Sequence, residues 1–557
     1  MKVHEMPRDY ELTEEQLNAI NSNENMVITA CPGSGKTTVI VEKIRKELNE
    51  LPSYQGVIGI TFTQKSAKEL KERCKKDSFD IKSTFLGTID HFCLQEIIYP
   101  FISRLYGIRD SILECKSYRD IDHIFKVGLP DLNENEVVLR TSDYSALEEI
   151  FINHYNNGFI LLEAVGIIAN NLIGNSSSCK RYLKARYKTL YIDEYQDSSE
   201  VQHKLFLNIY ELGLKAVAVG DINQSIYAWR GSNPQYIQEL ISKSDVFEHH
   251  IVNINHRCHI SISNYANRLL DENCKIIDCD DLRVYQFQMI GTQVNVANEL
   301  NTFIPQIMDV HRIENYSNVA ILVKNNKSLE YLKENITLPY KVYDDDILLL
   351  INTSISKLLY ELLVYRLNEN ILINDVLESL IGYDFSNKST LKKDREKIRE
   401  IRICLDVSLK TKLISLVSQL LNETPTDREI EILDEILASE ELLNKYNFQE
   451  DNELQIMTLH KSKGLEFEIV IHLDLYEFIL PFQQIIDDDW NNPIYPNLEQ
   501  DLNLHYVGIT RAKSACYLIY SNRRLNRSNQ NRQGKPSYFL YKNGLNGLFN
   551  NLNLLQG

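Results

Sequence analysis

A short apolar segment that runs into a loop with two glycines is the feature that most restricts how this chain can fold. Residues 26–30, MVITA, have the composition of a buried strand, and the sequence CPGSG followed by Lys36 and Thr37 comes directly after them. The glycines let the backbone approach a bound group closely, and the unpaired N–H groups where the next helix begins point at phosphate oxygens. Lys36 adds a positive charge, and the Thr37 hydroxyl can hold Mg²⁺. The segment predicts a strand, a phosphate-binding loop and a helix within an α/β fold.

The residues of this loop share an expected contact with nucleotide phosphate or its metal ion; they are Ala30, Cys31, Gly33, Ser34, Gly35, Lys36, Thr37 and Thr38. Ala30 stands where the pattern usually has glycine, so the first position of the match is imperfect. The strand before the loop and the helix after it compensate for that difference.

Length and composition indicate a multidomain globular protein. The 557 residues exceed the size at which a single hydrophobic core keeps growing. No run of about 18 apolar residues occurs, and the first residues lack a basic region followed by an apolar one, so we expect a cytoplasmic protein without a membrane segment. The ten cysteines do not have metal-binding spacing. The net charge of −17 argues against a nonspecific nucleic-acid coat, although a local basic groove can still bind a phosphate backbone.

Apolar strand-like runs, each followed by a helical pattern, recur along the chain and predict parallel sheets with crossover helices. The runs are residues 26–30, 57–62, 189–192, 216–219, 319–323, 469–473 and 516–520. Two long stretches between them, about residues 94–186 and 350–450, have a mainly helical pattern and are typical of inserted domains. The second stretch contains a dense charge run at residues 388–402, which favours a solvent-exposed helix face, with a DNA contact as the alternative.

Two adjacent acids at the end of a strand-like run supply the chemistry that a phosphate loop needs. They are Asp193 and Glu194, in the sequence LYIDEYQD. Phosphoryl transfer needs one carboxylate to fix the metal ion that bridges the phosphates, and a second group to orient the attacking water. We therefore expect Asp193 to hold Mg²⁺ together with Thr37, and Glu194 to activate water.

Further motifs, read in order, resemble those of the superfamily 1 helicases of the UvrD, Rep and PcrA type. The motifs that carry the likeness are LTEEQLNAI around Gln16, TFTQKSAKEL from Thr61, GTIDHF from Gly87, VGDINQSIYAWRG from Val219, NHRC from Asn255, MTLHKSKGLEFEIV from Met457 and YVGITRAK from Tyr506. The resemblance covers most of the chain and follows the family's motif order from end to end.

The resemblance implies an α/β fold with two RecA-like P-loop domains, each a parallel sheet flanked by helices and each carrying a mainly helical insertion, in the arrangement called 1A, 1B, 2A and 2B. The implied boundaries are residues 1–93 and 187–250 for domain 1A, 94–186 for insertion 1B, 251–350 and 451–557 for domain 2A, and 351–450 for a reduced insertion 2B. ATP would lie between the two RecA-like domains, with single-stranded DNA crossing above them.

For the ATP site, the resemblance assigns roles outside the phosphate loop. Gln16 corresponds to the residue that reads adenine, Glu466 to the one that holds the ribose, and Gln224 to the one that senses the terminal phosphate. Arg257 and Arg511 correspond to the guanidinium groups that stabilise the charge of the phosphate in transfer. His256 replaces the tyrosine that stacks on adenine in the family, and its smaller ring offers less stacking area.

For the nucleic acid, the resemblance implies a strand gripped through stacked bases and nearby polar groups, without sequence preference. The residues expected to contact it are Phe62, Thr63, His91, Phe92, Tyr227, Trp229, Arg230 and His460. The implied activity is ATP-driven movement along single-stranded or 3′-overhang DNA in the 3′ to 5′ direction.

Within the family the chain most resembles GajB, the helicase-like subunit of the bacterial Gabija antiphage systems. That resemblance implies a separate nuclease subunit of the GajA type in a hetero-oligomer. Two alternatives stay open: a housekeeping role in DNA repair or plasmid replication, and a nucleic-acid-gated ATPase that acts as a sensor or scaffold without productive unwinding. The second alternative is favoured by the small size of the 351–450 stretch.

Overall fold

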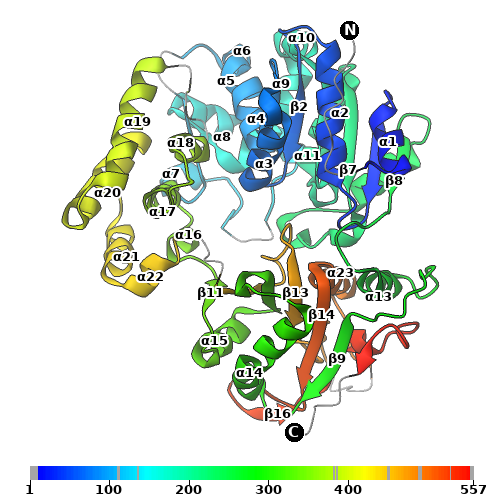
Figure 1. The fold of residues 1–557 in the computed structure, drawn as a ribbon. Helices are drawn as coiled ribbons and strands as arrows, with labels where there is room; N and C mark the ends of the chain where they lie inside the picture. The colour runs from blue at the N-terminus through cyan, green and yellow to red at the C-terminus, as the bar shows by residue number, and fades with distance from the viewer. Residues whose placement is uncertain are drawn as a thin grey trace. The chain divides into compact units, whose positions relative to one another are not determined.

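The computed structural model describes residues 11–109, 113–133, 137–380, 383, 385, 387–447, 452–486, 492–526 and 528–551. This part of the chain forms two compact units (Figure 1), and each is described by itself. Unit 1 ends at His256, and unit 2 begins at Arg257 and contains nearly all of the later residues.

Unit 1 is built on a sheet whose neighbouring strands are all parallel among the described residues. The strand order is β3-β2-β6-β7-β1-β8. The strands are β1 (Met26–Ala30), β2 (Gly56–Thr61), β3 (Phe85–Thr88), β6 (Tyr187–Ile192), β7 (Lys215–Gly220) and β8 (Glu248–Val252). Because parallel strands end at the same edge of a sheet, the loops that follow β1, β2, β6 and β7 share one edge.

Helices cover both faces of this sheet. Met26, Ile28 and Ala30 pack into one buried cluster with α1 and α2, whereas Val27 belongs to the cluster on the other face. The helices of unit 1 are α1 (Glu14–Asn21), α2 (Lys36–Glu50), α3 (Gln64–Lys75), α4 (Ile89–Phe92), α5 (Tyr99–Phe101), α6 (Ser103–Tyr106), α7 (His123–Lys126), α8 (Tyr144–Asn156), α9 (Val165–Asn175), α10 (Ser177–Arg186), α11 (Glu200–Glu211) and α12 (Gln235–Ser242). The stretch between β3 and β6 is mainly helical and contains one short parallel pair, β4 (Glu114–Lys116) and β5 (Phe159–Leu161).

Unit 2 has a second parallel sheet, with the order β11-β12-β10-β13-β14-β9-β17 in the described part of the chain. Its strands are β9 (Val284–Met289), β10 (Val319–Val323), β11 (Tyr340–Tyr343), β12 (Leu454–Thr458), β13 (Phe467–His472), β14 (Ala512–Ser521) and β17 (Asn550–Asn551). An antiparallel hairpin, β15 (Arg523–Leu525) and β16 (Asn531–Gln533), follows β14.

The helices of unit 2 fall into two groups, those that flank its sheet and those of the stretch between β11 and β12. The flanking helices are α13 (Ile260–Leu270), α14 (Gln293–His311), α15 (Asn326–Asn335) and α23 (Leu498–Ile509). The others are α16 (Ile347–Ile351), α17 (Ser354–Leu367), α18 (Ile373–Ser379), α19 (Lys388–Ile403), α20 (Asp406–Leu421), α21 (Asp427–Ala438) and α22 (Glu440–Asn444). The charge run at 388–402 lies on α19, where Asp394, Ile398 and Ile401 are buried and most of the charged side chains are exposed.

A pair of histidines lies in the core of unit 2. His472 on β13 donates its Nδ1–H to the Leu473 carbonyl oxygen at 2.9 Å, so its Nε2 accepts from His505 Nδ1 on α23, at 3.0 Å. Both side chains are fully buried. Burial lowers the pKa of His472 to about 4 and holds the pKa of His505 well below its ordinary value. Both rings are therefore neutral in the folded protein at physiological pH.

The fold class predicted from the sequence is confirmed, since two parallel sheets are each flanked by helices and each unit carries a mainly helical stretch within it. None of the described helices combines the length and the hydropathy that crossing a bilayer requires. The four domain boundaries stay predictions.

Candidate functional site

The phosphate loop lies between β1 and α2 and has the backbone that its glycines permit. Gly33 and Gly35 have φ values of 71° and 80°, in the left-handed region that other residues rarely adopt. A Cβ atom at Gly35 would come within 2.7 Å of Gln16 Nε2. The loop is braced from inside, because the Ser34 hydroxyl donates to the Cys31 carbonyl oxygen at 2.8 Å. The predicted cradle is present, and a side chain at its last glycine would strain the left-handed backbone and displace the Gln16 amide.

Gln16 links the start of α1 to this loop. Its Nε2 donates to the Ser34 carbonyl oxygen at 2.9 Å, and its Oε1 accepts from the Thr13 backbone N–H at 2.9 Å. The side chain is buried. Gln16 therefore positions the loop in this structure, and only the second N–H and the remaining acceptor capacity of its amide are left for a base. Adenine contact by Gln16 stays a prediction.

The predicted acids lie at the carboxyl end of β6, and the electrostatics place Lys36 close to them. Burial, and then the charge of Glu194, raise the pKa of Asp193, while the Lys36 ammonium lowers it. Burial also raises the pKa of Asp221, the residue directly after β7, and Lys36 again opposes the shift. One ammonium group therefore lies near two buried carboxyl groups that come from neighbouring strands.

Hydrogen bonds connect the acids to the loop that follows β7. Glu194 has a left-handed backbone, with φ 52°, and its carboxylate accepts from the Gln196 side-chain amide. Gln196 Oε1 in turn accepts from the Asp221 backbone N–H at 2.9 Å. Gln224 Nε2 donates to Asp221 Oδ2 at 2.6 Å. The structure thus brings Glu194 and Gln224 into one network, as the sequence interpretation requires for groups that act on the same phosphate.

Two residues of this site were missed from the sequence. Asp221 is the centre of the network just described, and its position directly after an apolar strand, as for Asp193, is a signal that could have identified it. Arg73 on α3 donates from Nη2 to Thr38 Oγ1 at 2.9 Å, so a guanidinium group lies at the first turn of α2. No motif spacing distinguishes Arg73 from the other basic residues of α3.

An aromatic platform follows β2 and β7 at the same edge of the sheet. The Phe62 and Tyr227 rings stack at a centroid distance of 5.6 Å and an interplanar angle of 14°. Trp229 meets Tyr227 edge to face at 6.5 Å and is 39% exposed, which is unusual for so large an apolar side chain. These three predicted DNA contacts are gathered in one place, where an exposed ring face can accept a base.

The other predicted DNA contacts of unit 1 are distributed differently. Thr63 Oγ1 accepts from the Ser66 backbone N–H and so begins α3. His91 lies on the single turn of α4. Phe92 is a correction: its side chain is fully buried and packs against Phe85 and Tyr187, so its ring is part of the core and cannot stack on a base. The Arg230 side chain lies outside the described residues.

Arg257 and Glu466, the predicted nucleotide-binding residues of unit 2, pair with each other. Arg257 Nε donates to Glu466 Oε2 at 2.8 Å, and Lys513 Nζ lies 2.8 Å from Glu466 Oε1. Burial would raise the pKa of Glu466, but hydrogen bonds and charges from Lys513 and Arg257 outweigh it and hold that pKa below its ordinary value. Glu466 is therefore an ionised carboxylate shared by two cations.

Arg511 is almost completely buried and donates to carbonyl oxygens of its own unit, from Nε to Val507 at 3.1 Å and from Nη1 to Leu465 at 3.2 Å.

His460 lies in the turn after β12, partly exposed. His256 is exposed at the end of unit 1, and its backbone N–H donates to the Gly33 carbonyl oxygen at 2.9 Å. The backbone of His256 is thus tied to the phosphate loop while its ring remains accessible.

Comparison with known proteins agrees with this geometry. Residues 13–230 match the model of an AAA domain, and residues 385–523 match that of the UvrD-like helicase C-terminal domain. The chain is a UvrD-like helicase.

Similar proteins extend over nearly the whole of this UvrD-like helicase. The Gabija protein GajB of Bacillus cereus (strain VD045) is 28% identical, over 92% of this chain and 96% of that protein. The ATP-dependent DNA helicase Rep of Buchnera aphidicola subsp. Schizaphis graminum (strain Sg) is 26% identical, over 95% of each chain. The ATP-dependent DNA helicase PcrA of Staphylococcus aureus (strain MRSA252) is 24% identical, over 92% of this chain and 83% of that protein. The UvrD-like helicase described here is accordingly an ATP-hydrolysing enzyme with two RecA-like domains.

Proposed function

We propose that this UvrD-like helicase moves 3′ to 5′ along single-stranded DNA as the helicase subunit of a bacterial, Gabija-type antiphage complex in the cytoplasm. The observation that carries the proposal is the shared edge of the unit 1 sheet, where Lys36 and two buried carboxyl groups lie beside the network of Glu194 and Gln224, and where the aromatic platform ends neighbouring strands. Hydrolysis and strand contact can therefore influence each other through the short loops after β2, β6 and β7.

In the ATP half of the proposal, the N–H groups at the start of α2 and the Lys36 ammonium bind the phosphates. Glu194 accepts the proton of the attacking water. Its left-handed backbone is a conformation that costs free energy in a residue other than glycine and is concentrated at functional sites. Gln224 couples the terminal phosphate to the loop that carries Tyr227 and Trp229, since all three residues lie between β7 and α12.

The residues also fit a Mg²⁺ ion. A buried carboxyl group with a raised pKa, such as Asp193, is stabilised as a carboxylate when a cation is bound next to it. Mg²⁺ takes oxygen ligands and is usually bound through one or two carboxylates together with substrate phosphates. We assign Asp193 and the Thr37 hydroxyl as its protein ligands. When bound, the ion supplies positive charge to the phosphate oxygens.

For unit 2, we propose that Arg257 and Arg511 stabilise the negative charge that spreads over the phosphate in transfer, and that Glu466 holds the ribose. The contacts within unit 2 set a condition on this role. Arg257 must exchange Glu466 for phosphate, and Arg511 must release the carbonyl oxygens of Val507 and Leu465. A nucleotide that provides stronger, charged acceptors favours the exchange.

The antiphage role rests on the similarity to GajB over almost the full length of both chains. If it holds, the chain assembles with a separate GajA-type nuclease subunit. The four-domain division given above is part of the same proposal, with residues 94–186 and 351–450 as the insertions available to a partner.

The test is steady-state ATP hydrolysis by the purified chain without DNA, with single-stranded DNA, and with a duplex that has a 3′ overhang, followed by strand displacement on the overhang substrate. Stimulation with displacement of the strand from the 3′-overhang duplex, and none from a 5′-overhang duplex, is the expected result. Displacement from the 5′-overhang duplex alone would contradict the polarity.

Stimulation without displacement would favour the alternative of a DNA-gated ATPase that regulates a partner. Co-purification of the tagged chain with a GajA-type nuclease, and loss of phage protection when Glu194 is replaced by glutamine, separate the antiphage role from a housekeeping role in repair.

A further inference from the structure

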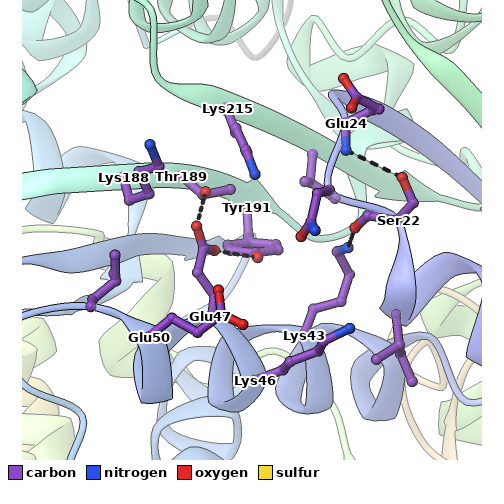
Figure 2. Close-up of a pocket in the computed structure, with 14 residues that line it drawn as sticks. Ser22, Glu24, Lys43, Lys46, Glu47, Glu50, Lys188, Thr189, Tyr191 and Lys215 are labelled. Carbon is purple, nitrogen blue, oxygen red and sulfur yellow. Dashed lines mark hydrogen bonds between the residues drawn. The ribbon is translucent and has the colours of Figure 1, made fainter.

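A cavity at the opposite edge of the unit 1 sheet takes no part in the proposed ATP or DNA chemistry. It lies between the second half of α2, the loop from α1 to β1, and the amino ends of β6 and β7 (Figure 2), and its volume is about 80 Å³. One ordered water needs only about 15 Å³ by the same kind of measure, so the cavity is large enough for a small polyatomic ligand. The phosphate loop and Asp193 lie at the other ends of α2 and β6.

Charged side chains make up half of the lining. Four lysines and three glutamates face this cavity: Lys43, Lys46, Lys188, Lys215, Glu24, Glu47 and Glu50. Lys43 is 6% exposed, and its Nζ donates to the carbonyl oxygens of Ala19 and Ser22 at 2.9 and 2.8 Å. An ammonium group has three N–H donors, so one donor of Lys43 remains.

Lys215 extends from β7 into the cavity toward Tyr191 and Glu47, as Figure 2 shows. No hydrogen bond or ion pair joins its ammonium group to any residue in the described part of the chain. Burial lowers the pKa of Lys43 to about 8, with further lowering by the charges of Lys46 and Lys215 and an opposing effect of Glu47. The ammonium groups therefore repel one another, and a bound anion would relieve the repulsion.

Glu47 adds a second kind of recognition. Its two carboxylate oxygens accept hydrogen bonds from Thr189 Oγ1 at 2.5 Å and from the Tyr191 hydroxyl at 2.7 Å. A carboxylate has about four acceptor positions, so Glu47 can accept one more hydrogen bond from a ligand. A ligand that fits must therefore offer anionic oxygens to lysines and also a hydroxyl group to a carboxylate.

We propose that this cavity binds a hydrogen phosphate group, with its oxygens on Lys43 and Lys215 and its hydroxyl on Glu47. Sulfate has the same shape and charge but carries no proton at neutral pH, so it meets Glu47 as an unpaired acceptor. The ligand is inorganic phosphate, because a phosphomonoester such as a nucleoside monophosphate is mostly an unprotonated dianion at neutral pH and meets Glu47 as an unpaired acceptor, as sulfate does.

Continuous elements connect this cavity to the ATP site. α2 runs from Lys36 to the cavity, and the seven residues from Lys36 to Lys43 span about 10 Å of helix. β6 and β7 begin at the cavity and end next to Asp193 and Asp221. Binding that shifts α2 along the sheet would therefore change the position of Lys36 relative to the two acids.

The test is titration of inorganic phosphate into the full chain saturated with ADP and Mg²⁺, which fill the phosphate loop, at an ionic strength held constant with chloride. Calorimetry and the melting temperature report binding. We expect saturable binding of phosphate, at least tenfold weaker binding of sulfate, and at least tenfold weaker binding of phosphate to Lys215→Met. The matched control, Lys204→Met on the exposed face of α11, should bind phosphate as the unmodified chain does.

A second variant tests the role assigned to the hydroxyl contact. Glu47→Gln should reduce the preference for phosphate over sulfate, and its ATP hydrolysis with single-stranded DNA reports whether it is folded. Adenosine monophosphate, mostly an unprotonated dianion at neutral pH, should bind at least tenfold more weakly than inorganic phosphate, as sulfate does. Equal binding of phosphate, sulfate and chloride, or full phosphate affinity in Lys215→Met, would overturn the proposal, whatever the result for ATP hydrolysis.

Discussion

The two units carry their predicted nucleotide-binding residues in different states. In unit 1, Glu194 and Gln224 already belong to one network, and the loop glycines have the backbone that phosphate binding needs. In unit 2, Arg257 is paired with Glu466, and Arg511 is occupied by backbone carbonyl oxygens. Unit 1 is therefore arranged for its ligand in advance, whereas unit 2 must exchange internal contacts for contacts to nucleotide.

The difference indicates which half determines binding and which determines turnover. A preorganised loop lowers the cost of binding nucleotide. Guanidinium groups that are released only by a charged acceptor contribute most to the rate of hydrolysis in the transition state, when the negative charge on the phosphate is greatest. Variants in unit 1 and unit 2 should accordingly differ in their effects on KM and kcat.

The largest effect is expected for Glu194→Gln in unit 1. Loss of the general base should lower kcat of ATP hydrolysis with single-stranded DNA by about a thousandfold. Nucleotide binding should persist, because Lys36 and the loop are unchanged, and fluorescent ADP measures it. Glu211→Gln, at the exposed end of α11, is the matched control. Normal turnover by Glu194→Gln would show that the catalytic role is wrongly assigned.

Arg257→Ala tests whether unit 2 contributes mainly to turnover. We expect kcat to fall by about a hundredfold, the usual effect of removing one transition-state donor, with a smaller change in KM. Lysine at this position should not restore the rate, because an ammonium group lacks the planar fork of donors. Arg399→Ala, on the exposed face of α19, controls for loss of charge. A rise in KM with unchanged kcat would instead make Arg257 a ground-state binding residue.

The histidine pair extends the comparison to stability. The pKa of His472 is lowered in the folded state, so its contribution to stability is present above the unfolded value of 6.5 and is lost as pH falls toward about 4. At pH 5 the loss for His472 is about 2 kcal/mol. The pH dependence of stability that comes from Asp193 in unit 1 has the opposite sign. The pKa of Asp193 is raised in the folded state, so its contribution to stability is present at low pH and is lost as pH rises.

Hydrogen exchange at pH 7.5 and pH 5, followed in each unit after correction for the intrinsic rate, measures this difference. Unit 2 should lose protection at the lower pH, and His472→Gln, which cannot titrate, should reduce the loss. The same loss in His472→Gln would assign the acid sensitivity to other groups.

Trp229→Ala should have the smallest effect, a roughly tenfold loss of single-stranded DNA affinity, as for removal of one stacked base contact. Fluorescence anisotropy with a labelled oligonucleotide measures it, and hydrolysis at saturating DNA should be partly retained. Phe92→Leu provides the contrast. It should lower the melting temperature because Phe92 lies in the core, and leave the DNA affinity of the folded protein unchanged. Weakened DNA binding by Phe92→Leu in folded protein would restore the original assignment.

The sequence predicts most of the buried strands but misses β12, which is fully buried, and it misses the strands at the sheet edges. Residues 26–30 and 319–323 are strands β1 and β10 with the predicted bounds, because continuous apolar runs are typical of central parallel strands. β8, with the sequence EHHIV, was missed since it lies at the edge and most of its side chains are not buried. β9 lies between β14 and the short strand β17, and it was missed because polar residues interrupt its apolar ones, so it forms no continuous apolar run.

The site was predictable where a function requires a local pattern and was not where it requires a distant contact. The phosphate loop and the acids after β6 are local patterns of spacing. The contact of Arg73 with Thr38 and that of Gln16 with Ser34 join segments that only the folded sheet brings together. Phe92 was misassigned because an aromatic residue in a motif can serve the core as well as a ligand, and the sequence alone does not distinguish the two.

The order of strands along the chain has a consequence for synthesis on the ribosome. Every strand of the unit 1 sheet lies between Met26 and Val252, so that sheet can close while the later half of the chain is still being translated. The unit 2 sheet cannot, because β12 fills the place between β11 and β10 only after more than a hundred intervening residues have emerged. Until then β10 and β11 expose unpaired edges, which are prone to aggregation. Unit 1 passes through a similar stage, because β1 has no partner until β7 has emerged, so each nascent unit exposes unpaired strands before its own sheet is complete.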